Sequence, residues 1–223
     1  PLTAMMSVMD HAPGDRQSPD VETYRKRYQK NPNLAPDEVE AHIRELIEAS
    51  KTYGPPNRKA LAALARERGI PLATHDDARA EHVEEAVAMG AVLTEFPTTL
   101  EAAEAARAHA LPTLMGSPNL IRGGSHSGNV AAAELARAEL LDMFASDYIP
   151  ASLLQGALRL TADDFGVPIP RAVAMVADEP ARALGLDDRG RLEVGRRADL
   201  VEVQLVRERP IVRSVWSAGR RVA

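Results

Sequence analysis

The sequence predicts an α/β fold in which short parallel strands alternate with helices, as in part of a (β/α)8 TIM barrel. From Pro55 onward, alanine-rich amphipathic segments alternate with short apolar runs. Glycine follows two of these segments, at Gly69 and Gly90, where it is expected to cap the carboxyl end of a helix. Strands separated by helices pair in parallel through right-handed crossovers, and in a barrel their carboxyl ends share the face that carries the chemistry.

The predicted elements begin with a strand at residues 4–9. Charged residues fill the next long segment, 21–53, and its apolar positions recur at helical spacing, so we expect a helical insertion at about 20–54. Further strands are expected at 71–74, 91–94, 112–115 and 140–145, and helices at 56–68, 80–89, 99–109, 129–138, 150–165 and 170–184. The residues between the strand at 112–115 and the helix at 129–138 are expected to form a long loop.

Five strands do not close an eight-stranded barrel, so about three further strands are expected before residue 1. After the last helix the pattern changes, because the runs 192–195, 198–203 and 211–219 alternate apolar and polar residues as half-buried antiparallel strands do. The sequence therefore predicts a partial barrel over 1–188 and a small β-sandwich segment over 189–223.

The composition restricts the classes of function. Of 223 residues, 45% are hydrophobic, which is enough to build a core. The formal net charge of −5 argues against a nucleic acid or a membrane as partner. The chain has no cysteine, so a metal ion would need histidine or carboxylate ligands. No apolar run approaches the length of a membrane span, and a cytoplasmic location is expected. The sequence leaves a homo-oligomer open.

Histidine and aspartate residues stand where the predicted strands end. His75 and Asp76 follow one strand, Asp147 follows another, and His11 follows the first. Imidazole and carboxylate groups from neighbouring strand ends can converge on one metal ion. Each residue also has a simpler interpretation: Asp76 or Asp77 as a helix cap, Asp147 as a cap of the helix near residue 150, and His11 as a hydrogen-bonded histidine.

A glycine-rich loop is the candidate site for anionic groups. Its exposed amides and polar side chains could receive phosphate oxygens, and they belong to Arg122, Gly123, Gly124, Ser125, His126 and Asn129. The simpler alternative is a turn that uses glycine for positive φ. Glu95 could bind substrate from its strand end, or pair with a neighbouring arginine. His42, His82 and His109 lie on predicted helices and are expected at the surface.

Two carboxyl-terminal segments resemble the barrel exit and β-sandwich of the metal-dependent amidohydrolase superfamily: residues 179–186 and 190–201. Five others resemble the branch of that superfamily that serves phosphonate catabolism by the carbon–phosphorus lyase pathway: residues 9–14, 74–77, 95–99, 122–129 and 146–150. The resemblance extends over the whole chain in the same order. The His-x-His pair of the early barrel strands, which supplies metal ligands in the superfamily, has no counterpart in this sequence.

The resemblance implies an amidohydrolase-type barrel and a divalent metal ion, with zinc, manganese and iron all compatible. It implies His75, Asp147 and His11 as metal ligands, with Asp147 and His11 also catalytic. Substrate binding would fall to Asp76, Glu95 and the loop residues from Arg122 to Asn129. The implied reaction is hydrolysis of a phosphorylated ribose phosphonate, α-D-ribose 1-methylphosphonate 5-triphosphate, to the 5-phosphate and pyrophosphate. Two alternatives remain: hydrolysis of a carbon–nitrogen bond, as in a deaminase or deacetylase, and an inactive fragment lacking part of the metal site.

Overall fold

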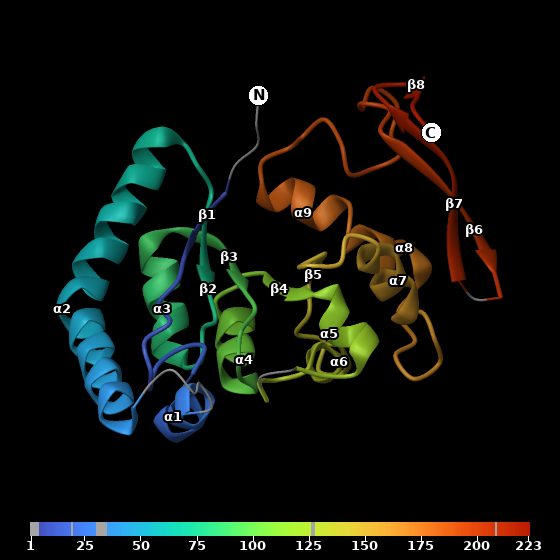
Figure 1. Cartoon of the computed structure of the whole chain (residues 1–223). Coiled ribbons are helices and arrows are strands. Elements are labelled where there is room, and N and C mark those ends of the chain that lie inside the picture. The colour runs from blue at the N-terminus through green and yellow to red at the C-terminus, as the bar shows by residue number, and fades with distance from the viewer. Residues whose placement is uncertain (1–4, 19, 30–34, 126–127, 208) are drawn as a thin grey trace. The chain divides into compact units, whose positions relative to one another are not determined.

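The protein consists of two compact units, one up to Thr113 and the other from Leu114 onward. A computed structural model describes residues 5–18, 20–29, 35–125, 128–207 and 209–223 (Figure 1). We call the two parts the first unit and the second unit. The predicted domain boundary near residue 188 stays a prediction.

Three parallel strands form the sheet of the first unit, in the order in which they occur in the chain. They are β1 (Met6–Val8), β2 (Leu72–His75) and β3 (Ala91–Glu95). Thr74 pairs in register with Val8 on one side and with Thr94 on the other, and His75 pairs with Glu95. The α/β class is confirmed, and the carboxyl ends of these strands lie at one edge, as expected.

The helical insertion differs from its prediction in one respect. Helix α1 (Val21–Gln29) packs on α2 (Pro36–Arg68) through a cluster that contains Tyr24, Val39 and Ile43. Figure 1 shows that α2 is a single long helix, whereas the sequence predicted a separate helix from residue 56. The break was expected because the helix contains Pro55 and Pro56, which lack the N–H groups that would bond to the preceding turn.

A carboxylate from the loop after β1 explains how α2 continues through its two prolines. Asp10 Oδ2 accepts a hydrogen bond of 2.6 Å from Ser50 Oγ, on one side of the prolines, and contacts Arg58 Nη1 at 3.4 Å on the other. A Cβ atom at Gly54 would lie 3.1 Å from the same carboxylate oxygen, so the glycine permits the close approach. Local propensity is overridden here by contacts with a distant segment.

The two helices that follow β2 and β3 were predicted closely. They are α3 (Ala80–Met89) and α4 (Leu100–Ala108), and they pack through a cluster of small apolar side chains: Val83, Ala86, Ala102, Ala106 and Leu111. Thr99 Oγ1 accepts the N–H of Ala102 at 3.1 Å and caps α4. Gly69 and Gly90 cap α2 and α3 in the left-handed conformation, as expected.

The second unit contains β4 (Thr113–Gly116), which begins at the last residue of the first unit, and β5 (Met143–Ala145), paired in parallel. Its helices are α5 (Ser117–Arg122), α6 (Ala132–Arg137), α7 (Ser152–Arg159), α8 (Ile169–Ala174) and α9 (Asp178–Ala183). Part of the segment predicted as a loop therefore forms α5. The single helix predicted at 170–184 is two helices joined by turns, and the carbonyl of Met175 between them accepts a hydrogen bond from Phe144 N.

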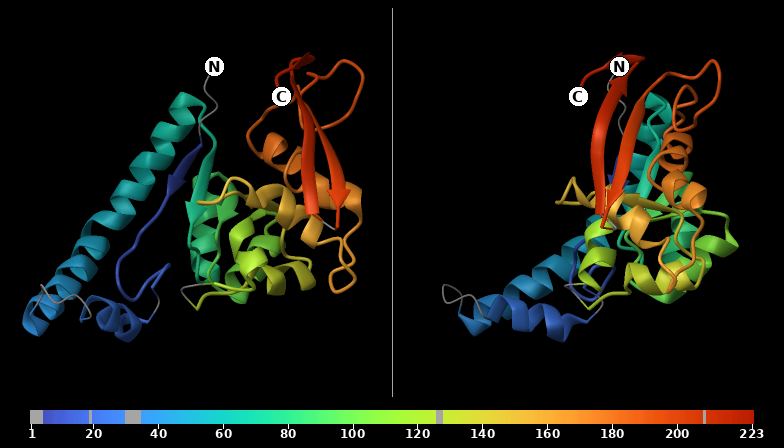
Figure 2. Two further views of the ribbon diagram at one scale, coloured as in Figure 1. Left: turned by 45° about the vertical axis from the view of Figure 1, so that its right-hand side comes forward. Right: turned by 90° about the vertical axis from the view of Figure 1, so that its right-hand side faces the viewer.

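The carboxyl-terminal sheet is antiparallel, as predicted. It consists of β6 (Leu200–Val206), β7 (Arg209–Ser217) and β8 (Arg220–Arg221), and Figure 2 shows β6 and β7 as a long hairpin. The strand expected at 192–195 is wrong, because Arg196 N bonds to Glu193 O in a turn and Val194 is fully exposed. Among the residues that the structure describes, no helix combines the length and apolarity that a bilayer crossing requires.

Candidate metal centre

At the carboxyl end of β2, the backbone conformation of Asp76 directs its carboxylate toward the preceding residue, His75. Asp76 adopts a left-handed conformation with φ of 59°, and its N–H donates to Glu95 O on β3 at 2.9 Å. Its Oδ2 atom consequently lies 2.8 Å from Nδ1 of His75. Both side chains are largely buried, with 7% and 15% of their surface exposed.

His11 completes the cluster from the loop after β1. Its Nε2 atom is 3.5 Å from Asp76 Oδ2, and its ring lies edge-on to that of His75, with 6.2 Å between centroids. One ligand atom from each of His11, His75 and Asp76 lies within 4.8 Å of the others. Two of the residues were predicted as metal ligands, whereas Asp76 was predicted to bind substrate.

Glu95 and Phe96, at the end of β3, border the cluster. Glu95 Oε2 lies 4.0 Å from Nε2 of His75 and accepts a hydrogen bond of 3.0 Å from Ser7 Oγ on β1. Among the described residues, Glu95 thus contacts a histidine and a serine rather than the neighbouring arginine that the sequence left as an alternative. Phe96 also adopts a positive φ, and its ring packs edge-on against that of His75 at 5.2 Å.

The cluster has the donor set and the electrostatics that a divalent cation requires. His75 Nδ1 and Asp76 Oδ2 are buried and contact each other, and His11 Nε2 approaches the same carboxylate oxygen at 3.5 Å. Burial by itself lowers the pKa of the His75 imidazole, but the adjacent Asp76 carboxylate, with Glu95 and Asp77 behind it, raises that pKa above its ordinary value on balance. Nitrogen and oxygen donors in a negative field fit a transition metal ion.

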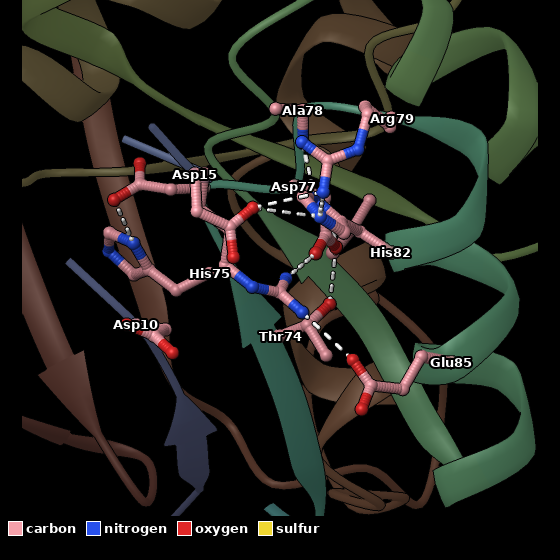
Figure 3. Close-up of polar contacts among 12 residues, drawn as sticks. Asp10, Asp15, Thr74, His75, Asp77, Ala78, Arg79, His82 and Glu85 are labelled. Carbon is pink, nitrogen blue, oxygen red and sulfur yellow. Dashed lines mark hydrogen bonds and ion pairs between the residues drawn. The ribbon is translucent and has the colours of Figure 1, made fainter. Parts of the chain in front are cut away.

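The sequence did not reveal a buried ionic layer beside the cluster, and Figure 3 shows its residues Asp77, Thr74 and Glu85 near His75. Asp77 is fully buried, and its Oδ2 accepts hydrogen bonds from Thr74 Oγ1 at 2.5 Å and Thr94 Oγ1 at 2.7 Å. Its Oδ1 contacts the guanidinium of Arg16, which is 1% exposed and also contacts Glu85 Oε2 at 3.1 Å. Arginine in a polar loop has no local signal for burial, so this pair could be found only in three dimensions.

His82 is a further correction, because it was expected at the surface and is 6% exposed. Its Nδ1 accepts the N–H of Ala78 at 3.1 Å, and its Nε2 faces Asp15 Oδ1 at 3.0 Å (Figure 3). The contact with His82 is the main reason why the pKa of Asp15 is well below its usual range, and Arg79 contributes to the same effect. The imidazole thus fixes the start of α3 to the loop that carries His11.

In the second unit, Asp147 and Tyr148 follow β5 in an exposed turn, and Asp147 has a φ of 51°. The N-cap of α7 is Ala151, so Asp147 does not occupy the cap position considered from the sequence. Arg122 Nη1 donates to Tyr148 Oη at 2.7 Å, a partner that the sequence did not indicate. The expected convergence of Asp147 with His75 involves both units and stays a prediction.

Gly123 and Gly124, in the loop predicted to bind phosphate, have a structural role. The N–H groups of Gly123 and Gly124 both bond to Asn119 O and close the end of α5. Their amides are therefore not free donors, contrary to the expectation. Arg122 Nη2 donates a hydrogen bond to Gly124 O at 3.2 Å. Ser125 and Asn129 are partly buried, and His126 lies outside the described residues.

Comparisons with known proteins place the fold and the sequence in one family. The sequence model described as "Amidohydrolase family" matches residues 22–223. The chain is 47% identical over its 223 residues to the alpha-D-ribose 1-methylphosphonate 5-triphosphate diphosphatase of Escherichia coli strain K12. It spans 59% of the length of that curated relative.

Two solved structures share the fold. A crystal structure of an uncharacterized protein matches with a TM-score of 0.57 and 17% identity, over 74% of this chain and 48% of the other. The adenosine deaminase from Xanthomonas campestris with bound zinc matches with a TM-score of 0.52 and 21% identity, over 84% and 56%. At these identities the matches concern the fold alone.

Proposed function

Since the chain belongs to the amidohydrolase family, we propose that it acts as a metal-dependent hydrolase that converts α-D-ribose 1-methylphosphonate 5-triphosphate to the 5-phosphate and pyrophosphate. The observation that carries the proposal is the 47% identity to the E. coli diphosphatase, which extends over every part of this chain. The reaction belongs to phosphonate catabolism, and the anionic ribose phosphonate is the small-molecule partner.

His11, His75 and Asp76 would hold a divalent cation such as zinc, manganese or iron, with Asp147 as a further ligand. When bound, such an ion lowers the pKa of a coordinated water from 15.7 to about 7 and polarises a phosphoryl oxygen. Glu95 Oε2 lies 4.0 Å from Nε2 of His75, so it adds negative charge beside the imidazole without a hydrogen bond to it.

The remaining steps fall to residues of the second unit. Asp147, an exposed carboxylate after β5, takes the proton of the attacking water. The water oxygen bonds to phosphorus, the anhydride bond between the α- and β-phosphoryl groups breaks, and its electron pair leaves on pyrophosphate. Arg122 supplies positive charge to the phosphate chain, with Ser125 and Asn129 as additional donors. A chain with a net charge of −5 needs such local positive charge to bind this substrate.

The proposal is tested by incubating the purified chain, loaded in turn with Zn²⁺, Mn²⁺ or Fe²⁺, with the ribose triphosphate and measuring pyrophosphate release. Release that stops after chelation and returns with the metal supports it. Turnover of adenosine or of an N-acetylated sugar, without pyrophosphate release, would replace it with carbon–nitrogen hydrolysis. Absence of bound divalent ion, together with no hydrolysis of any of these substrates, would support the inactive-fragment alternative.

A further inference from the structure

We propose that the buried pair of Arg16 and Asp77 positions the candidate metal ligands and thereby sets the affinity of the cluster for a divalent cation. The inference rests on the proposed metal centre. Neither residue belongs to the cluster of His11, His75 and Asp76, so each would act through the residues that it holds.

The Asp77 carboxylate contacts the three segments that carry His11, His75 and Glu95. Its Oδ2 accepts from Thr74, the residue before His75, and from Thr94, the residue before Glu95. Thr74 and Thr94 are register partners on β2 and β3, so one carboxylate oxygen fixes the ends of both strands. The other oxygen holds Arg16, which lies in the loop that follows β1.

Arg16 anchors the loop that carries His11 at a position after His11 in the chain. Its guanidinium is buried between Asp77 and Glu85, and a buried charge is strongly unfavourable without such partners. Asp10 anchors the same loop just before His11. Its carboxylate accepts a hydrogen bond from Ala12 N at 3.1 Å and contacts the side chains of Ser50 and Arg58. His11 stands between these two anchors, so its position is set even though 48% of its side chain is exposed.

Backbone hydrogen bonds on both sides of Asp76 hold its unusual conformation. A positive φ is unfavourable for a residue with a side chain and persists where the surroundings impose it. Asp76 is fixed on one side by its N–H bond to Glu95 O, and on the other by Asp77, whose carbonyl accepts the N–H of Thr98 at 2.8 Å. This conformation is what directs the Asp76 carboxylate toward His75.

A merely structural role would lower stability and leave the metal affinity of the folded protein unchanged. The test therefore titrates the folded chain with Zn²⁺ and Mn²⁺ by calorimetry at low temperature, with circular dichroism to establish folding. Asp77→Asn is expected to weaken binding about tenfold to a hundredfold, as removal of groups that orient ligands does. Thr94→Val removes one bond to Asp77 without unpairing a charge, and a severalfold loss is expected.

Val39→Ala is the matched control, because Val39 is buried in the cluster between α1 and α2 and its truncation lowers stability away from the ligands. Its metal affinity should stay within twofold of the parent. If Asp77→Asn does not fold, Thr94→Val decides the outcome. Folded variants that bind metal as tightly as the parent overturn the positioning role. A parent chain that binds no divalent ion overturns the proposed centre itself, and the inference with it.

Discussion

His75 Nδ1 and Asp76 Oδ2 are both buried and contact each other at 2.8 Å. An imidazole nitrogen and a carboxylate oxygen at this distance can share a proton, and both are also ligand atoms for a metal ion. A cation bound between these atoms and His11 would have both as ligands. The proposed metal centre is the explanation that connects this pair with the family of the chain.

Replacement of Asp76 by asparagine is expected to weaken divalent metal binding by at least tenfold. Asparagine adopts positive φ readily, so the fold should persist while the charge of one ligand is lost. Calorimetric titration with Zn²⁺ measures the effect, and His75→Ala should behave similarly. His109→Ala, at an exposed histidine after α4, is the control and should bind as the parent does. Equal affinity in all three variants would exclude the cluster as the metal site.

Replacement of Arg122 by alanine is expected to lower kcat/KM for pyrophosphate release about tenfold to a hundredfold, the usual range for a lost charge-assisted hydrogen bond. Tyr148→Phe should have a smaller effect, chiefly on KM, because Arg122 keeps its contact with Gly124 O. Arg213→Ala, at an exposed arginine on β7 that contacts Gln204, should retain parental kinetics. Unchanged kinetics in Arg122→Ala would count against an anionic substrate at this arginine.

Replacement of Gly156 by alanine is expected to destabilise the second unit. A Cβ atom there would lie 2.8 Å from Ser117 Oγ and 3.1 Å from Ser117 Cβ, where α7 meets α5. Overpacking of this kind costs about 1–3 kcal/mol, which exceeds the roughly 1 kcal/mol that alanine gains over glycine in a helix. Thermal unfolding should show a lower Tm, and Ser117→Gly should restore part of the loss in the double variant. A higher Tm for Gly156→Ala alone would contradict the close contact.

The stabilising effect of Asp15 should depend on pH in the acid range. Its folded pKa is depressed, so its contribution is complete above the unfolded pKa of about 3.9 and is lost as the pH falls toward the folded pKa. The groups that face it are His82 and Arg79. The difference in Tm between the parent and Asp15→Asn should therefore be present at pH 5 and shrink below about pH 4. A difference that does not shrink as the pH falls below 4 would refute the assignment.

Local sequence determined the alternation of strands and helices, because burial on one face of a helix or strand leaves a short-range pattern of apolar residues. The same patterns placed His11, His75 and Asp76 at strand ends, and parallel pairing requires such ends to meet at one edge. The helix caps at Gly69 and Gly90 could also be predicted from the local sequence, because a backbone with positive φ favours glycine.

Only the tertiary structure decided which charges are buried and what holds them. Arg16 and Asp77 are 61 positions apart, and the continuity of α2 through its prolines accompanies the contact of Ser50 and Arg58 with Asp10. His82 is buried because Asp15 and Ala78 face it. Short-range patterns show whether a position is apolar, whereas the partner of a buried charge depends on which distant segments the fold brings together. For that reason the strand-end positions of His11, His75 and Asp76 could be predicted from the sequence, and the ionic layer beside them could not.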